Sequence, residues 1–179
     1  MPLNVRPATH DDQPAIRRVI AEVHLPRMNL QWPNFVVVEE DREIVAMGQV
    51  KSHRDGSREL ASIAVVPKRQ GEGVGTAVIE TLLGREVGAV LHLSCRRELE
   101  GYYERFGFKR VERAEYPPYF RLTARMANMI TRLFGIHLIV MRRQAVGSPV
   151  GPRTIHTNGT NLIARPLAHA FRGSPLRDS

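Results

Sequence analysis

Cysteine is almost absent from this chain, since Cys95 is the only one among 179 residues. A single cysteine excludes an internal disulfide framework and fits a reducing compartment. We interpret Cys95 as a small buried residue near a strand end, because no general base beside it in the sequence marks it as a nucleophile. Long apolar runs are missing too: none reaches the length of a membrane span, and the first residues lack the apolar segment of a signal peptide. We therefore predict a cytoplasmic protein with no membrane partner.

Residues with the spacing of metal ligands are also missing. His156 and His169 are isolated, and no cluster of Cys, His and Asp occurs elsewhere in the sequence, so we expect chemistry without a metal. Lysine is scarce, because Lys51, Lys68 and Lys109 are the only lysines among 26 basic residues; the net charge is +8. A basic surface suits a polyanionic cofactor and could attract nucleic acid non-specifically. Zinc-finger spacing, a basic heptad region and an RNA-binding aromatic motif are all absent, so we do not expect a nucleic-acid partner.

The most informative stretch combines a strand, a glycine-rich loop and the start of a helix. An apolar run from Leu60 to Val66 ends at Pro67, and a basic, glycine-rich turn follows from Lys68 to Gly75. Apolar residues at helical spacing begin immediately, at Val74, Val78 and Leu82. Free backbone N–H groups and the positive end of the helix dipole converge in such a loop. We therefore predict that it binds an anion such as a phosphate group.

Several kinds of phosphate loop can be compared with this one. A nucleotide-binding P-loop needs a lysine before its Ser or Thr, whereas Thr76 follows Gly75 directly. A dinucleotide-binding loop would use Gly71 and Gly73, but Thr76 stands where its third glycine or alanine belongs, so this match is weak. An ordinary glycine-rich turn stays open on these residues alone.

A second motif, Leu99 to Phe108 (LEGYYERFGF), lies at a suitable distance from the loop. Together with Gln70-x-x-Gly73-x-Gly75, it resembles the hallmarks of the GNAT N-acetyltransferases. The resemblance covers roughly residues 3–142. It implies an α/β fold with a mixed, mostly antiparallel central sheet, helices on both faces, and splayed central strands that form an acyl-coenzyme A cleft. It also implies transfer of an acetyl group from acetyl-coenzyme A to a primary amine.

The resemblance assigns a role to each part of the two motifs. The pantetheine arm of the cofactor would bond to the backbone of Ile63, Ala64 and Val65, and an amide near Val65 would polarise the thioester carbonyl. The loop that binds the pyrophosphate would consist of Gln70, Gly71, Glu72, Gly73, Val74, Gly75 and Thr76. Tyr103 would protonate the departing thiolate, although a pair of half-buried aromatics is the alternative interpretation of Tyr102 and Tyr103.

The general base is open at this level. Glu59 stands six residues before Val65, where the histone-type branch of the superfamily carries its glutamate base, and a surface glutamate at a strand edge is an equally good interpretation. His53 and His92 are reserve bases. The branch that acetylates ribosomal proteins places a glutamate where this chain has Leu91 and an asparagine where it has Arg96, so its substrate does not carry over.

The rest of the chain completes one domain and a tail. We predict an acetyltransferase domain over residues 1–143, with an extra helix over about 120–134, and a Gly- and Pro-rich tail over 144–179. That helix carries Arg121, Arg125 and Arg132; it either packs on the domain or serves as a lid or dimer contact that binds an acidic acceptor. Predicted strands cover Leu3–Arg6, Phe35–Glu39, Glu43–Val50, Ala89–Ser94, Lys109–Arg113 and Ile136–Met141, and predicted helices cover the Ile16–Val23 region, Val74–Glu86 and Arg97–Phe106.

Two further functions remain as alternatives. The chain could be an acyl-coenzyme A-binding regulatory or interaction domain without turnover, or a basic protein that binds nucleic acid. No motif specifies the acceptor, which we expect to be a small molecule or a peptide with an amine. A homodimer is possible, but no motif specifies it either.

Overall fold

The computed structural model describes residues 3–131 and 137–145, and every structural statement below concerns these residues. The predicted tail, apart from Gln144 and Ala145, lies outside them, as does the end of the helix predicted over residues 120–134. No helix in this part of the chain is long and apolar enough to span a bilayer.

The described residues form one sheet of seven strands in the order β1-β2-β3-β4-β5-β7-β6. All neighbouring strands are antiparallel except β4 and β5, which run parallel. The fold class predicted from the two motifs is thereby confirmed. The strands are β1 (Asn4–Pro7), β2 (Phe35–Glu40), β3 (Glu43–Ser52), β4 (Arg58–Val65), β5 (Leu91–Arg96), β6 (Lys109–Arg110) and β7 (Leu138–Arg143). The helices are α1 (Gln13–Glu22), α2 (Val74–Arg85), α3 (Glu100–Glu104) and α4 (Pro118–Thr131).

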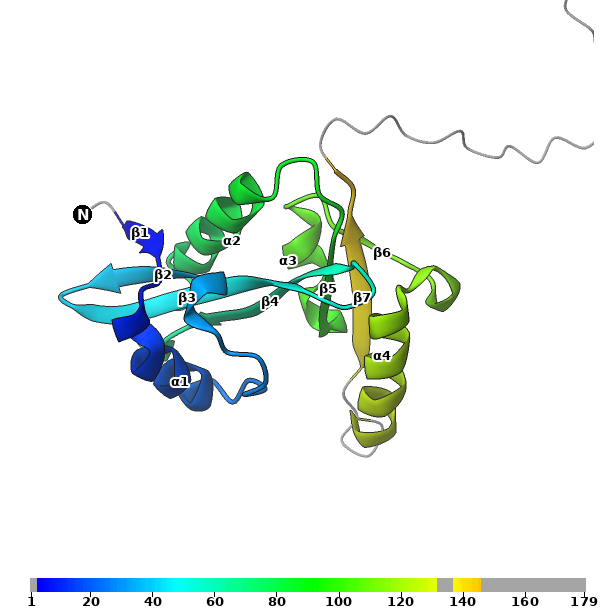
Figure 1. Cartoon of the computed structure of the whole chain (residues 1–179), viewed down its shortest axis with the longest axis horizontal. Coiled ribbons are helices and arrows are strands. Elements are labelled where there is room, and N and C mark those ends of the chain that lie inside the picture. The colour runs from blue at the N-terminus through cyan, green and yellow to red at the C-terminus, as the bar shows by residue number, and fades with distance from the viewer. Residues whose placement is uncertain (1–2, 132–136, 146–179) are drawn as a thin grey trace, which may run out of the picture. The chain divides into compact units, whose positions relative to one another are not determined.

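Helices cover both faces of the sheet because its central strands are apolar on both sides. In β2, Val36 and Val38 pack in one cluster with α2, whereas Phe35 and Val37 pack in another with α1. Figure 1 shows α2 and α3 on one side of the sheet and α1 and α4 on the other.

The parallel pair β4 and β5 separates soon after it begins. Only Arg58 with Leu91 and Glu59 with His92 are in register, and the following residues of the two strands are not paired. The carboxyl-terminal half of β4 is therefore bonded to β3 alone. Its other edge offers backbone N–H and C=O groups to a ligand. This is the splayed arrangement that the resemblance implied.

A bulge shapes the same half of β4. Ala61 pairs with Gln49 and Ala64 with Met47, so two residues, Ser62 and Ile63, lie opposite Gly48 alone. Ser62 has φ +56°, and its hydroxyl accepts a 2.8 Å hydrogen bond from Gln49 Nε2. A Cβ at Gly48 would lie 2.5 Å from Ile63 Cδ1, so only glycine fits opposite the bulge.

Several predicted boundaries differ from the structure by a few residues. The strand predicted over Lys109–Arg113 ends at Arg110, because Arg113–Glu115 forms a 3-10 turn capped by Glu112. The helix predicted over Arg97–Phe106 begins as a 3-10 turn, and only Glu100–Glu104 is α-helical. The last strand begins at Leu138 instead of residue 136, which lies outside the described residues.

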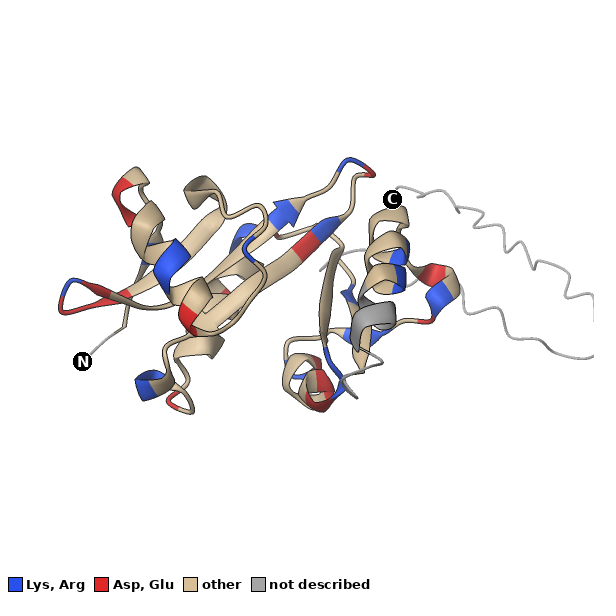
Figure 2. Cartoon of the chain, turned by 90° about the horizontal axis from the view of Figure 1, so that it is seen from below, with Lys and Arg blue, Asp and Glu red and all other residues tan. Residues whose placement is uncertain are grey.

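Charged residues of both signs are interspersed along the described elements, as Figure 2 shows. One buried cluster fixes the first strand to the start of α1: Arg6 donates to Asp12 at 2.7 Å and 2.9 Å and to Glu39 at 2.7 Å. Asp12 also accepts from the backbone of Thr9, which caps the short turn that precedes α1. The basic excess is therefore spread out and partly neutralised.

Candidate active site

The glycine loop between β4 and α2 is shaped to admit a bulky ligand. Gly71 and Gly73 have φ values of +83° and +81°, and Gly73 is the residue before the first turn of α2. A Cβ added at either glycine would meet no atom within 4 Å, so both face open space. A Cβ at Gly75 would lie 3.2 Å from Val65 Cγ2 and 3.4 Å from the Tyr102 hydroxyl. The concave backbone at the helix N-terminus fits the anion site predicted from the sequence.

A cavity of about 270 Å³ opens over this loop. Seven of the ten residues predicted to bind the cofactor line it, whereas Ile63, Ala64 and Glu72 do not. Glu72 instead forms an ion pair with Arg69, at 3.0 Å. The lining consists of Val65, Arg69, Gln70, Gly71, Gly73, Val74, Gly75, Thr76, Tyr102 and Arg105.

Two side chains hold the loop against the sheet. Gln70 Nε2 donates a 3.0 Å hydrogen bond to the carbonyl of Val65, which ties the loop to the end of β4. Arg69 forms ion pairs with Glu40 at 2.8 Å and with Glu72 at 3.0 Å. We infer that these contacts preorganise the loop before a ligand arrives.

The two tyrosines of α3 lie in different environments. Tyr102 lines the loop cavity, and the guanidinium of Arg105 lies 4.7 Å from the centroid of its ring. Tyr103 packs edge-on against Phe108, with ring centroids 6.2 Å apart, and it does not line the cavity. Burial raises the pKa of the Tyr103 phenol, so this group keeps its proton at neutral pH. Tyr102 and Arg105 were not predicted as ligand contacts, although both stand in the second motif.

Cys95 is buried on β5, as predicted, and burial raises the pKa of its thiol to about 11. The thiol is therefore protonated at neutral pH and is not activated as a nucleophile.

Glu59 lies next to His53 at the start of β4. Its Oε2 is 3.0 Å from His53 Nε2, and the two side chains are only 13% and 7% exposed. The His53 ring stacks on Tyr119 of α4, with centroids 3.4 Å apart and an interplanar angle of 14°. The predicted base and one of its reserves therefore form a single unit, which α4 covers.

His92 joins this group from the neighbouring strand. It is in register with Glu59, and its ring lies 5.3 Å from Phe120, which also contacts His53. Its Nδ1 is buried without a hydrogen-bond partner. Burial is the main cause that lowers the pKa of His92, and the nearby charge of Arg142 acts in the same direction. His92 is thus held in its neutral form near Glu59.

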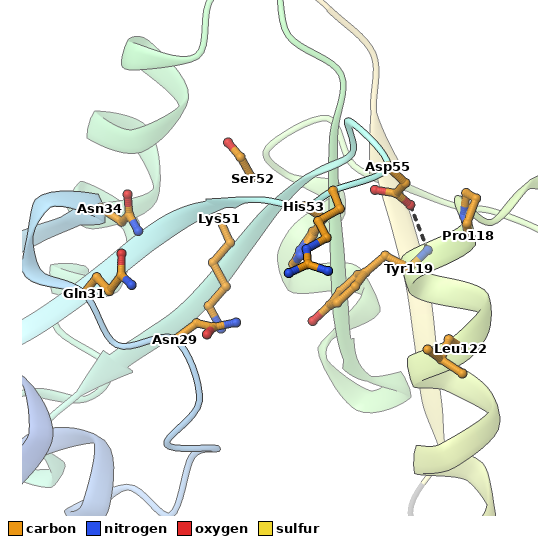
Figure 3. Close-up of a pocket in the computed structure, with 11 residues that line it drawn as sticks. Asn29, Gln31, Asn34, Lys51, Ser52, His53, Asp55, Pro118, Tyr119 and Leu122 are labelled. Carbon is orange, nitrogen blue, oxygen red and sulfur yellow. Dashed lines mark hydrogen bonds between the residues drawn. The ribbon is translucent and has the colours of Figure 1, made fainter.

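A second cavity, of about 680 Å³, opens beside Glu59 and His53 on the side of α1 and α4. Figure 3 shows that its walls come from the segment before β2, from the end of β3 and its turn, and from the first turn of α4. The lining consists of Asn29, Gln31, Asn34, Lys51, Ser52, His53, Arg54, Asp55, Pro118, Tyr119 and Leu122. Lys51 was not predicted as a site residue. The hairpin turn at Asp55-Gly56 pairs it with Glu59 on the next strand, and this pairing could have indicated that Lys51 lies near the predicted base.

Asp55 attaches α4 to the β3–β4 turn. Its Oδ2 accepts a 2.8 Å hydrogen bond from the backbone N–H of Tyr119, and its Oδ1 accepts from Ser57. These hydrogen bonds, with that of the Ser57 hydroxyl foremost, lower the pKa of Asp55 to about 2. The helix predicted from its apolar stripe therefore forms a wall of the second cavity.

The arginines of α4 do not all point to an acidic acceptor, which was one prediction for this helix. Arg121 donates to the carbonyls of Tyr116 and Ala114 at 2.8 Å and 3.1 Å, which engages it in the preceding turn. Arg125 is exposed, and Arg132 lies outside the described residues. Within the described ranges, no group of three or more His, Cys, Asp or Glu side chains could hold a metal ion.

This combination of a splayed parallel pair, a glycine loop at a helix N-terminus and an adjoining cavity defines the GNAT acetyltransferase fold. Residues 31–110 match the family model described as the acetyltransferase (GNAT) domain, and this range contains both motifs. This range is 80 of the chain's 179 residues, and the match agrees with the resemblance found in the two motifs. No curated protein matches the chain by sequence.

Solved structures of other proteins have a similar fold. N-acetylglutamate synthase from Neisseria gonorrhoeae, complexed with coenzyme A and N-acetyl-glutamate, is 20% identical with a TM-score of 0.60; the match covers 82% of this chain and 36% of that one. Rv2747 from Mycobacterium tuberculosis, in complex with coenzyme A, is 20% identical with a TM-score of 0.62, covering 79% and 99%. The ribosomal-protein-S18-alanine N-acetyltransferase from Escherichia coli is 19% identical with a TM-score of 0.58, covering 85% and 99%. The match thus spans little more than a third of the Neisseria enzyme.

Proposed function

We propose that this protein transfers an acetyl group from acetyl-coenzyme A to a primary amine. The observation that carries the proposal is the separation of β4 from β5 directly after Glu59, with the glycine loop at the far end of β4. The acceptor cavity lies at the near end, beside Glu59 and His53. One strand therefore connects a site for a phosphate-bearing donor to a site for an acceptor. The coenzyme A complexes of the Neisseria and Mycobacterium structures support this choice of donor.

The loop residues fit the donor. Backbone N–H groups of residues 71–76 would hold the pyrophosphate, because the open space at Gly71 and Gly73 admits it and the α2 dipole favours negative charge. The free edge of β4, at Ile63 to Val65, would bond to the pantetheine arm. When bound, acetyl-coenzyme A would supply the acetyl group as a thioester.

Glu59 would act as the general base. An ammonium group must lose a proton before its nitrogen can attack a carbonyl, and a carboxylate within reach can accept that proton directly or through a water molecule. The side chain of Glu59 is 13% exposed, and its contact with His53, which lines the acceptor cavity, holds its orientation. His53, whose Nε2 lies 3.0 Å from Glu59 Oε2, lies close enough to share the proton with it.

Tyr103 would act as the general acid toward the sulfur. Its buried phenol stays protonated at neutral pH, which a proton donor requires. A backbone amide near Val65 would stabilise negative charge on the carbonyl oxygen. Because Tyr102 and not Tyr103 lines the loop cavity, the two tyrosines need to be tested side by side.

We also keep three predictions about the whole protein. These are a cytoplasmic location, a domain over residues 1–143 followed by a tail, and a possible homodimer. The single cysteine supports the first of them. The alternative function, an acyl-coenzyme A-binding domain without turnover, shares the donor site and differs only in lacking acetyl transfer.

The test is calorimetric titration of the full chain with acetyl-coenzyme A. The Gly73→Glu variant places a side chain and a negative charge in the open space of the loop, so we expect it to abolish binding. Gly84→Glu is the matched control, because Gly84 lies on the same helix, is exposed, and has no atom within 4 Å of an added Cβ. Equal binding by both variants, or none by the wild type, would contradict the proposed donor site. Thiol release with an amine panel then separates the enzyme from the non-catalytic alternative.

A further inference from the structure

Lys51 is one of two cations that line the acceptor cavity, together with Arg54, and among the described residues neither forms an ion pair with a carboxylate. Lys51 is on β3, in register with Glu59 on β4, so both side chains leave the sheet on the same face. Its ammonium makes one long hydrogen bond, 3.4 Å to the carbonyl of Met28. Figure 3 shows the side chain extending across the cavity toward Asn29, away from His53 and Tyr119. The Lys51 side chain therefore points toward the segment before β2, whereas the Glu59 carboxylate contacts His53.

The acidic groups nearest to Lys51 are already engaged. Asp55 accepts from Ser57 and from the backbone of Tyr119, and Glu59 is bonded to His53. Among the described residues, no carboxylate oxygen lies within ion-pair distance of the Lys51 ammonium. Burial lowers the pKa of Lys51, and the charge of Glu59 only partly opposes this. A desolvated cation without a partner is costly in a folded protein, and a bound anion would remove that cost.

Neutral hydrogen-bonding groups surround the same ammonium. Asn29, Gln31 and Asn34 line the cavity opposite β3, and each carboxamide can donate two N–H bonds without adding negative charge. The segment that carries them is held by Gln13 of α1. This side chain donates to the Leu30 carbonyl at 2.9 Å and accepts from the backbone of Trp32 at 3.0 Å. The cavity thus presents two cations, Lys51 and Arg54, and several amide donors on the wall that Gln13 holds.

We infer that the acceptor is a small amine that also carries a carboxylate, and that Lys51 binds this carboxylate. The inference rests on the proposed function, because it takes the amine to be delivered to Glu59. Lys51 and Glu59 are direct neighbours across two strands, about 5 Å apart at the backbone, so one small molecule can reach both. A polyamine does not fit this arrangement, since its second cation would face Lys51.

The test is calorimetric titration of the full-length protein saturated with coenzyme A. The probes are L-alanine, L-leucine and γ-aminobutyrate, each compared with its primary amide, and spermidine as a polycation. A charge-assisted hydrogen bond to a partly buried ammonium corresponds to roughly a tenfold to hundredfold preference, so we expect at least one carboxylate to bind that much more tightly than its amide. Spermidine should bind more weakly than this carboxylate.

Variants of Lys51 show whether this residue is responsible. Lys51→Met, of similar volume without charge, should abolish the preference while leaving coenzyme A binding unchanged. Lys51→Arg keeps the positive charge and should therefore retain part of the preference. Such retention would show that the loss in Lys51→Met does not come from misfolding. Lys109→Met is the matched control, because Lys109 is an exposed lysine on β6, away from the cavity. In turnover assays, Lys51→Met should raise the KM for the carboxylate and leave that for the amide unchanged.

Two results would overturn the inference: no probe carboxylate binds more tightly than its amide, or the preference survives in Lys51→Met. Failure of the proposed function has a different signature, since the wild type would then not bind coenzyme A. The same probes are in that case titrated into the free protein. In the free protein, a preference for the carboxylate that depends on Lys51 would still support the anion site. The absence of such a preference would reject the anion site.

Discussion

The two cavities of this protein differ in how they are built. The loop cavity comes mainly from consecutive residues, Val65 to Thr76, with Tyr102 and Arg105 added from α3. The acceptor cavity comes from three segments that are far apart in the sequence, around Asn29, Lys51 and Tyr119. Backbone atoms and glycines shape the first, whereas side chains of different chemistry shape the second. A donor site that binds one ligand can thus be a short motif, while the acceptor side can vary with little effect on the fold.

The largest effect that we expect concerns Glu59, which lies where the two sites meet. Glu59→Gln keeps the shape of the side chain and removes its capacity to accept a proton. Turnover with an amine should fall by roughly 100- to 10,000-fold, while the affinity for acetyl-coenzyme A should stay unchanged. The rate of thiol release measures the turnover, and calorimetry measures the affinity for acetyl-coenzyme A.

Glu80→Gln is the control for this experiment, because Glu80 is an exposed glutamate on α2. If Glu59→Gln turns over within threefold of the wild type, Glu59 is a structural partner of His53 and the base must be sought at His53 or His92.

A smaller effect should separate the two tyrosines. Tyr103→Phe removes the proposed proton donor, and we expect kcat to fall by about tenfold to 100-fold. The loss is limited because a thiol with a pKa of about 8.5 yields a thiolate that can leave without full protonation. Tyr102→Phe removes only a hydroxyl near Gly75, so it should weaken coenzyme A binding slightly and leave kcat nearly unchanged. The opposite pattern would make Tyr102 the proton donor.

The smallest effect should follow from Asp55→Asn, which loosens the wall that α4 forms. We expect the acceptor KM to rise about threefold, because one charge-assisted hydrogen bond to the Tyr119 N–H is weakened, and we expect no change at the donor site. Since the pKa of Asp55 is lowered to about 2, its contribution to stability is present above its ordinary value near 3.8 and is lost as the pH falls toward 2.

Thermal unfolding between pH 2.5 and 7 checks this pH dependence. The difference between wild type and Asp55→Asn should be constant at neutral pH and shrink below about pH 4. Asp41→Asn, the same change in the exposed β2–β3 turn, serves as the control. A difference that grows as the pH falls would contradict the role of Asp55.

The backbone shape of the glycine loop could be predicted from the sequence in some detail. Its features are local: an apolar strand, two glycines with positive φ, and a helix that begins at Val74. Each of these leaves a signal within a few neighbouring residues, because tight turns need glycine and helices repeat every 3.6 residues. The mixed, mostly antiparallel sheet followed from the resemblance and is confirmed, whereas the order of its strands was not predicted.

Only the tertiary structure decided which residues distant in the sequence come into contact. The opposition of Gly48 to the bulge at Ser62, the stacking of His53 on Tyr119 and the capping of α4 by Asp55 depend on sheet register and on where α4 packs. The unpaired ammonium of Lys51 is of the same kind, since its neighbours come from β4 and from the segment before β2. Residue type and spacing along the chain specify local backbone shape, but they do not record which side chains long-range packing brings together.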